Sequence, residues 1–383
     1  MRIAQGAPLH ESVPPKLYGG TERVVSYLTE ELVRQGHEVT LFASGDSETN
    51  ARLVAGCPRA LWQEPGCREA LPHHVRLVEL AARAAHRFDL IHFHLDYVHL
   101  QAVGGLPCST LTTLHGRLHP RDQEALFAAY PEAPLASISD DQRRPIPRAN
   151  WQATVYHGLP LDLHTPREAP GSYLAFLGRV SPEKGLEKAV EIARLARLPL
   201  RVAAKIYPEE RPYYEREIAP LLRASPWVEF VGEVGGSAKD DFLGGAHALL
   251  FPIEWAEPFG LVMIEAMACG TPVVAFRRGS VSEVMADGVT GLVVDDVAGA
   301  VAAVGRVGTL SRLACRRMFE TGFGATRMAR DYLAVYRRLI GGGSRPVARG
   351  AMPVERGAVP VTPLVDRGGL LGPVVPLQSP AGS

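Results

Sequence analysis

The second half of the chain alternates short apolar runs with amphipathic stretches. Residues 247–251 and 273–276 are apolar runs, which is typical of strands buried on both faces of a parallel sheet. Between them, residues 260–269 form an apolar helical segment that follows Pro258 and ends just before Gly270. Further strands are predicted in this half at 173–178, 200–205 and 228–234, and a helix at 209–223.

The first half shows the same alternation. A short strand at 3–6 is followed by a loop that ends in a diglycine, then by a helix to about Gln35 and a strand at 37–44. Further strands are predicted at 89–94, 109–114 and 134–139, and a helix near 75–87. This repeated alternation of strand and helix predicts two α/β domains of the Rossmann type.

The end of the chain differs from the rest. A last helix has an apolar stripe formed by Met328, Tyr332, Val335 and Leu339, and the residues after it are rich in glycine and proline without sustained periodicity. We expect an N-terminal domain at 1–165, a C-terminal domain at 166–322, a C-terminal helix at 323–340 and a disordered tail at 341–383.

Composition excludes several classes of protein. Lys plus Arg and Asp plus Glu balance at 41 each, so no nucleic-acid partner and no anionic membrane surface is indicated. There is no apolar run of about 18 residues, and the first residues lack the apolar core of a signal peptide. The five cysteines are scattered, with no C-x-x-C pair. We expect a cytoplasmic protein with at most peripheral membrane contact.

Two glutamates lie on either side of a predicted helix start in the segment EPFGLVMIEAMACGTPVVA. Glu257 precedes the helix and Glu265 lies one turn inside it. The free N–H groups of Gly260, Leu261 and Val262 form an anion site at the helix N-terminus. Carboxylates suit hydroxyl groups, so the implied ligand is a phosphate that carries polyols on both sides, as a sugar nucleotide does.

An alternative without any ligand remains open. Glu257 is also explained as a helix N-terminal acid favoured by the macrodipole, and Glu265 as a solvated helix residue. Against it, Glu265 lies in an almost wholly apolar helix, where an unpaired charge costs free energy.

The same segment resembles the E-x7-E motif of retaining glycosyltransferases of family 4, and the resemblance covers roughly residues 1–340. It implies the GT-B fold: an α/β protein with two Rossmann-like domains facing a cleft and a last helix that crosses back to the first domain. It also implies that Glu265 holds the ribose and Glu257 the donor sugar. The implied reaction is that of a hexosyltransferase-type enzyme, which moves a sugar with retention from a nucleoside diphosphate sugar, a UDP-sugar first, to an unknown acceptor. No cofactor is implied.

A second motif begins at the end of the strand at 173–178. In G-R-x-S-x-E-K-G, Ser181 is the predicted N-cap and Pro182 the first residue of a helix. The segment resembles the phosphate-binding loop of the family, so Arg179 and Lys184 are expected to neutralise the diphosphate in place of a metal ion. Two solvated cations would be the explanation without a ligand.

The first domain supplies three more predicted site residues. Gly19 and Gly20 lie between strand and helix, where phosphate can approach the backbone, although such a pair alone is typical of a turn. His115 follows the strand at 109–114, where a ligand or solvent could meet it. The resemblance implies that Gly20 and His115 complete the donor-sugar pocket. His157 stands where the family has an asparagine, and its role is open.

A different function is suggested by the strand at 89–94. His92, His94 and Asp96 alternate, so they share one face if the strand stays extended, as in the H-x-H-x-D run of metallo-hydrolases. Tyr97 stands where those enzymes have another histidine. A sugar-nucleotide epimerase of the same fold and a non-catalytic sugar-nucleotide sensor are further alternatives. No D-x-D occurs, so we expect no metal site.

Overall fold

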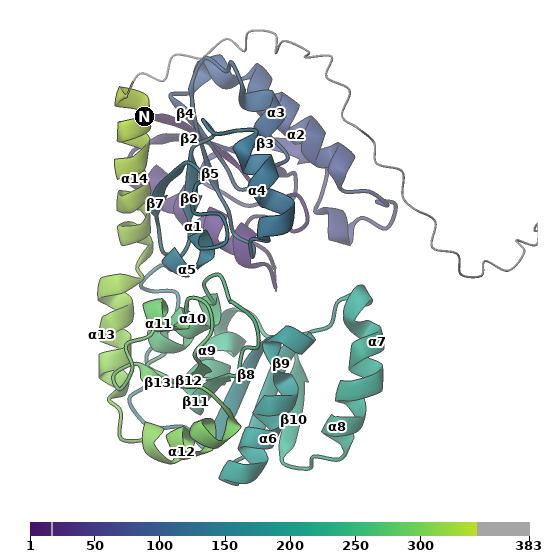
Figure 1. Ribbon diagram of the computed structural model, residues 1–383, viewed down its shortest axis with the longest axis vertical. Coiled ribbons are helices and arrows are strands. Elements are labelled where there is room, and N and C mark those ends of the chain that lie inside the picture. Colours follow the sequence, from purple (N-terminus) through teal and green to yellow (C-terminus); the bar gives the residue numbers. More distant parts are fainter. Residues whose placement is uncertain (17, 343–383) are drawn as a thin grey trace, which may run out of the picture. The chain divides into compact units, whose positions relative to one another are not determined.

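The computed structural model describes residues 1–16 and 18–342, and it contains two parallel β-sheets surrounded by helices (Figure 1). The first sheet has the order β3-β2-β1-β4-β5-β6-β7. Its strands are β1 (Arg2–Gly6), β2 (Glu38–Ser44), β3 (Arg52–Cys57), β4 (Leu90–Phe93), β5 (Ser109–Thr113), β6 (Leu135–Ser137) and β7 (Trp151–Thr154). The helices of this half are α1 (Gly20–Arg34), α2 (Leu71–Arg83), α3 (Leu100–Val103), α4 (Pro120–Ala128) and α5 (Asp140–Arg143).

The second sheet has the order β10-β9-β8-β11-β12-β13. Its strands are β8 (Tyr173–Arg179), β9 (Leu200–Lys205), β10 (Val228–Gly232), β11 (Ala246–Phe251), β12 (Val273–Phe276) and β13 (Gly291–Val294). The helices that follow β8 are α6 (Leu186–Ala196), α7 (Arg211–Tyr213), α8 (Ala219–Arg223), α9 (Gly236–Gly244), α10 (Leu261–Ala268), α11 (Val281–Val284), α12 (Val297–Val307), α13 (Arg312–Gly322) and α14 (Ala325–Gly341). The predicted domain boundary at 165/166 falls between β7 and β8.

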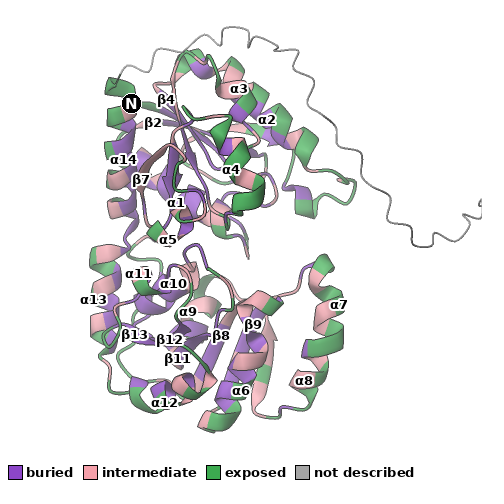
Figure 2. Ribbon diagram, viewed as in Figure 1, coloured by how far each residue is buried: buried purple, intermediate pink, exposed green. Residues whose placement is uncertain are grey.

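Both sheets have the buried, parallel character that the apolar runs predict. The central strands β4, β11 and β12 consist almost wholly of buried residues (Figure 2). In each sheet the strand order reverses once, between β1 and β4 and between β8 and β11. A parallel sheet binds ligands outside the carboxyl ends of its strands at such a reversal. The fold therefore places a ligand crevice in each half.

The helix predicted at 209–223 is interrupted in the structure. A π-helical turn, Tyr214–Ile218, separates α7 from α8. The physical reason is Pro220, which has no N–H to donate to the carbonyl one turn earlier. The strands β3 and β7 were not predicted, and both lie at the edges of the first sheet.

The last helix packs on the first domain, as the fold prediction requires. α14 lies against α1 and β5, and its buried residues form a stripe toward them (Figures 1 and 2). Met328, Tyr332 and Val335 of the predicted stripe are buried, and Leu339 is partly buried. The side chain of Tyr336 is also fully buried. The crossing helix is thus part of the core of the N-terminal half.

Ending the chain after Gly324 is expected to cause a large loss of stability, because it removes α14 and uncovers the first sheet. A single large-to-small change in a core costs about 2–5 kcal/mol, and this deletion removes several buried side chains at once. The measurement is a thermal melt beside a control chain that ends after Gly342 and keeps α14. Equal melting temperatures for the two chains would show that α14 contributes little. The tail that the sequence predicts to be disordered begins at residue 341. Its residues after Gly342 lie outside the described residues.

No single helix in residues 1–16 and 18–342 is long and apolar enough to cross a membrane. Only α12 and α13 taken together reach that length and apolarity, and they are bent by 107° where they meet. The cytoplasmic location and the peripheral membrane contact remain predictions.

Candidate functional site

A cavity lies at the carboxyl ends of strands from both sheets. From the first half it is lined by the start of α1 and by His115 and His157. From the second half it is lined by the ends of β8, β9 and β11, by Glu233 and Val234 after β10, and by the segment from Glu257 to Val262. Glu233 and Val234 belong to the loop between β10 and α9. This is the position that the two strand-order reversals predict.

The start of α10 forms one wall of the cavity. Gly260 is the N-cap residue in the left-handed conformation, with φ 76°, and it has no side chain to accept from the first N–H groups of the helix. Gly260, Leu261 and Val262 all line the cavity. The end of an eight-residue helix therefore presents backbone donors and the positive end of its dipole to a ligand.

Glu257 lies in front of this helix in an ion pair. Its Oε2 accepts from Lys184 Nζ at 2.6 Å and from Trp255 Nε1 at 2.8 Å. Glu257 is only 8% exposed, so its charge needs these partners. An ammonium group carries three N–H donors, so Lys184 can serve Glu257 and a phosphate at the same time. The two side chains therefore place one negative and one positive charge in front of the N-terminus of α10.

Glu265 lies one turn inside α10 in a second ion pair. Its Oε1 accepts from Lys239 Nζ at 2.9 Å, and both side chains line the cavity. Burial alone would raise the pKa of Glu265, but Lys239, with His164 and Arg23, holds the pKa below its usual value. Glu265 is therefore an ionised acceptor, and it is neither solvated nor unpaired.

His115 and His157 form the floor of the cavity on the side of the first domain. Their rings stack at 5.3 Å with an interplanar angle of 16°. Burial lowers the pKa of His115 to about 3, and burial also lowers that of His157 well below its usual value. Both rings are thus neutral hydrogen-bonding groups at neutral pH. The sequence left the role of His157 open. In the structure its ring packs against that of His115.

The predicted diglycine lies opposite α10. Gly19 is the N-cap of α1, which begins at Gly20. A Cβ atom at Gly20 would lie 3.5 Å from Leu261 Cδ1, so the starts of α1 and α10 approach each other. Arg23, one turn along α1, also lines the cavity. The small residues allow a ligand to lie between two helix starts.

The phosphate-loop motif differs from the prediction in its backbone. Pro182 to Lys184 form a 3₁₀ turn, and α6 begins only at Leu186. The helix cannot run through Gly185, which has φ 70°. A Cβ atom there would lie 2.1 Å from the carbonyl oxygen of Pro252, so only glycine fits. Lys184 therefore reaches the cavity from the end of a tight turn.

Arg179 is the predicted donor-binding residue that does not line the cavity. Its guanidinium group pairs with Glu183 at 2.5 Å and with Glu210 at 3.1 Å. The expectation that Arg179 and Lys184 together face the diphosphate therefore stays a prediction, and the structure shows Arg179 paired with two carboxylates. Two nearby carboxylates attract the guanidinium group, and Glu210 comes from a segment whose proximity the sequence did not indicate.

Several residues of the site were missed by the sequence reasoning. Lys205 lines the cavity and is the last residue of a predicted strand. Its place at the carboxyl end of that strand could have indicated a ligand-binding residue. Its ammonium group pairs with Glu11 at 3.2 Å. Lys239 and Tyr18 also line the cavity, and neither belongs to a motif.

Gly279 was missed as well. It has φ 55°, and a Cβ atom there would lie 2.3 Å from the backbone nitrogen of Glu257. The next residue, Ser280, donates its N–H to the carbonyl of Glu257 at 3.0 Å. The loop after β12 thus holds the backbone of Glu257 in place, and it does so only because residue 279 has no side chain.

The structure contradicts the metallo-hydrolase alternative. All four ring nitrogens of His92 and His94 lie within hydrogen-bond distance of protein side chains, so none is offered to a metal. The strand ends at Phe93, and Asp96 is exposed with φ 50°. Because the chain turns before Asp96, the three residues do not form the predicted ligand face.

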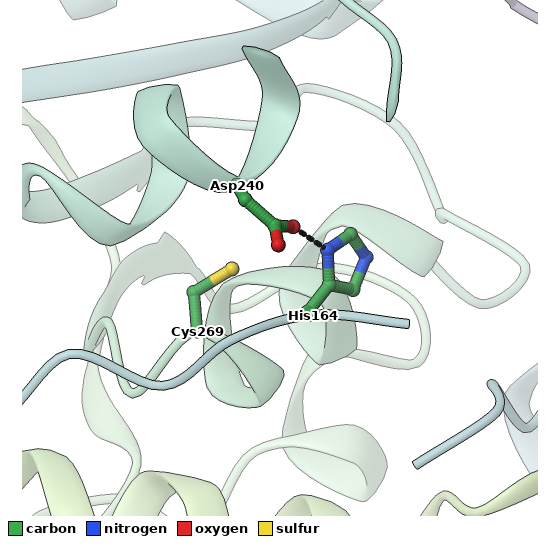
Figure 3. A group of neighbouring side chains, drawn as sticks. All are labelled: His164, Asp240 and Cys269. Carbon is green, nitrogen blue, oxygen red and sulfur yellow. Dashed lines mark hydrogen bonds and ion pairs between the residues drawn. The ribbon is translucent and has the colours of Figure 1, made fainter. Parts of the chain in front are cut away.

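A group of metal-ligand side chains lies outside the cavity lining (Figure 3). The Nδ1 atom of His164 bonds to the carboxylate of Asp240, and Sγ of Cys269 is turned toward both. Burial, with nearby carboxylates, raises the pKa of the Cys269 thiol to about 12. The guanidinium groups of Arg312 and Arg316 add positive charge near the thiol, which opposes a cation there. We interpret the His164–Asp240 bond as a tie between the segment after β7 and α9.

Comparisons with known proteins identify the family and the fold of the chain. Residues 18–154 match the model of the family described as Glycosyltransferase Family 4, and residues 166–307 match that described as Glycosyl transferases group 1. A phosphatidyl-myo-inositol mannosyltransferase of Mycolicibacterium smegmatis is 27% identical over 79% of this chain and 84% of the relative. A D-inositol 3-phosphate glycosyltransferase of Kribbella flavida is 35% identical, over 43% of each chain, which is less than half of that relative.

Solved structures share the whole architecture. AviGT4, a glycosyltransferase involved in avilamycin A biosynthesis, superimposes with a TM-score of 0.69 and 25% identity, over 89% of this chain and 98% of that chain. The relatives are named as enzymes that transfer sugars, which does not favour the epimerase or the sensor. Two parallel-sheet domains, the crossing α14 and the paired glutamates around α10 occur together with these matches. The chain therefore belongs to the glycosyltransferases of the family 4 type, with the GT-B fold.

Proposed function

We propose that this enzyme transfers a sugar, with retention of anomeric configuration, from a nucleoside diphosphate sugar to an acceptor, and that it needs no metal ion. One observation carries the proposal. Two buried glutamates flank the start of α10, and each is paired with a lysine that lines the same cavity. This places acceptors for hydroxyl groups on both sides of a site for anions, which matches the chemistry of a sugar nucleotide.

The proposed position of the donor follows from the order of these groups. The diphosphate lies at the N–H groups of α10 beside Lys184. The ribose lies at Glu265, deeper along the helix, and the transferred sugar lies between Glu257 and His115. Negative charge near an oxocarbenium-like transition state stabilises it, which is the role proposed for Glu257. Retention is proposed because the spacing of the two glutamates is that of the retaining family.

Lys184 and the start of α10 are proposed to stabilise the departing diphosphate. The leaving group gains negative charge as its bond to the sugar breaks, and preorganised donors stabilise that charge most strongly in a site screened from water. The α10 N–H groups are fixed by the helix, and Lys184 is fixed by its bond to Glu257. The chain thus supplies the positive charge that a divalent cation supplies in other enzymes.

The proposal is tested by incubating the full chain with UDP-glucose, GDP-mannose and ADP-glucose, one at a time, and following each reaction by proton NMR. We expect release of the nucleoside diphosphate from one donor, a UDP-sugar first, with water as the acceptor. The sugar that forms first should have the anomeric configuration of the donor. The opposite anomer would contradict retention. Conversion into an isomeric sugar nucleotide without release of diphosphate would favour an epimerase.

Activity is expected to survive removal of divalent metals, because cationic side chains and N–H groups take the place of a metal ion at the diphosphate. The measurement is the initial rate of donor consumption before and after dialysis against EDTA. Loss of activity that added Mg²⁺ or Mn²⁺ restores would contradict the proposed role of Lys184 and α10.

A further inference from the structure

A chain of buried polar side chains connects α14 to the floor of the cavity. Gln5, a fully buried residue of β1, lies at its centre. Gln5 Nε2 donates to the hydroxyl of Tyr336 at 3.2 Å, and Gln5 Oε1 lies 2.8 Å from His94 Nε2. His94 Nδ1 in turn lies 2.8 Å from His115 Nε2. This series of hydrogen-bonded side chains therefore runs from Tyr336 through Gln5 and His94 to His115.

Both imidazoles in this chain are neutral near neutral pH. Burial, followed by the neighbouring histidines, lowers the pKa of His94 well below its usual value, and burial lowers that of His115 to about 3. A neutral imidazole carries one proton, so one nitrogen donates and the other accepts. The position of the proton on one ring therefore determines its position on the next.

The orientation of the Gln5 amide sets this order. An amide oxygen can only accept, so His94 donates its Nε2–H to Gln5 Oε1 and accepts at Nδ1. His115 must then donate its Nε2–H to His94, which leaves His115 Nδ1 as an acceptor. Within the described residues, His115 Nδ1 is buried and has no hydrogen-bond partner. The ring lines the cavity, so a bound ligand is one source of the missing donor.

The other branch of the network is consistent with this order. The Tyr336 hydroxyl accepts from Gln5, and its own proton can be donated to His92 Nδ1, at 2.7 Å. In that arrangement His92 Nε2–H can donate to Thr113 Oγ1 at 2.7 Å, and the Thr113 hydroxyl can donate to that of Tyr332 at 2.9 Å. With the protons placed in this way, no two donors of the network face each other. Both tyrosines come from α14, so this branch of the network connects the crossing helix to the first sheet.

We propose that Gln5 is a positioning residue: acting through His94, it keeps the proton of His115 on Nε2 and presents the Nδ1 lone pair to a hydroxyl group of the bound glycosyl donor. It rests on the proposed function only for the identity of the ligand. Gln5 does not line the cavity, so its effect on the substrate passes through the two rings. A buried amide thus decides whether His115 accepts or donates.

The position of the proton is measured directly by long-range proton–nitrogen NMR on the full chain with ¹⁵N-labelled histidine. His115 is assigned by comparison with the variant His115→Gln. We expect a protonated Nε2 and an unprotonated Nδ1 in the wild type. The reverse orientation of the Gln5 amide would invert every bond and place the proton on Nδ1, and that result would overturn the proposal. The spectrum needs no donor, so it is independent of the proposed reaction.

Two variants test the role of Gln5 itself. Gln5→Met keeps the volume but removes the acceptor for His94, whereas Tyr336→Phe keeps that acceptor and removes the hydroxyl that contacts Gln5 Nε2 and His92 Nδ1. We expect Gln5→Met to show mixed protonation of His115, and kcat/KM to fall about tenfold, the effect of one lost hydrogen bond. Its affinity for the nucleoside diphosphate should stay unchanged, and Tyr336→Phe should keep the Nε2 proton. Identical His115 signals in all three proteins would overturn the role of Gln5. If Gln5→Met does not fold, the wild-type spectrum still decides the proton position.

Discussion

Lys184→Met is expected to lower kcat/KM for the glycosyl donor by about 100- to 1000-fold, the usual effect of removing one preorganised donor from a developing anion. Lys184 lies at the start of α10 and bonds to Glu257 at 2.6 Å. Its removal takes positive charge from the proposed diphosphate site and leaves the Glu257 carboxylate without its ion-pair partner. The measurement is the initial rate as a function of donor concentration.

A matched control for this variant lies one turn further along the same segment. Lys188 pairs with Glu254 at 2.9 Å, its side chain is 38% exposed, and it does not line the cavity. Lys188→Met removes the same charge and should leave the kinetics close to those of the wild type. A thermal melt of both variants separates a loss of chemistry from a loss of folded protein. Equal kinetics for Lys184→Met and Lys188→Met would remove Lys184 from the site.

Glu265→Gln and Glu257→Gln are expected to have different effects. Glu265→Gln weakens charge-assisted hydrogen bonds to the ribose, which contribute about 1.5–3 kcal/mol each, so the affinity for donor and for free nucleoside diphosphate should fall by about 10- to 100-fold. Glu257→Gln should lower turnover of the donor. It should leave the affinity for nucleoside diphosphate at least as high, because Lys184 loses its anionic partner and is left to the phosphates. Calorimetric titration beside initial rates measures both effects.

The two glutamate variants also control for each other. Both changes keep the shape of the side chain, and each leaves one lysine, Lys239 or Lys184, without its anionic partner. If Glu257→Gln lost nucleoside diphosphate binding while Glu265→Gln kept it, the proposed direction of the donor along α10 would be reversed.

The fold was predictable because its signals are local. Apolar runs bounded by proline and glycine gave the central strands, and the segment from Phe251 to Gly270 gave the strand end, the helix and its stop. These patterns depend only on neighbours along the chain and on burial. The stripe on the last helix likewise indicated a buried face. The edge strands β3 and β7 were missed because edge strands are only partly buried and lack such runs.

The candidate site was predictable as far as it is carried by motifs. Gly20, Lys184 and Glu265 all line one cavity, although they come from distant parts of the sequence. The residues that pair with the two site glutamates or support their backbone lie outside these motifs. Lys239 reaches Glu265 from α9, and Gly279 supports Glu257 from the loop after β12. Such pairings form only when the sheets are assembled, so no local pattern records them.

Arg179 shows a similar limit of local patterns. The motif predicts it at the diphosphate, and the sequence does not indicate its partner Glu210, which comes from the far end of a separate strand-to-helix connection. A sequence motif indicates which residue types occur together, and the competition between carboxylates for one guanidinium group is decided in three dimensions.

Binding of a nucleoside diphosphate at the start of α10 is the step on which the proposed reaction depends. The measurement is calorimetric titration of UDP, GDP and ADP, in separate experiments, into the wild type, Lys184→Met and Lys188→Met. We expect one of the three ligands, UDP first, to bind the wild type and Lys188→Met equally and to bind Lys184→Met much more weakly. No binding by any of the three ligands, or equal binding by all three proteins, would contradict a donor site at this cavity.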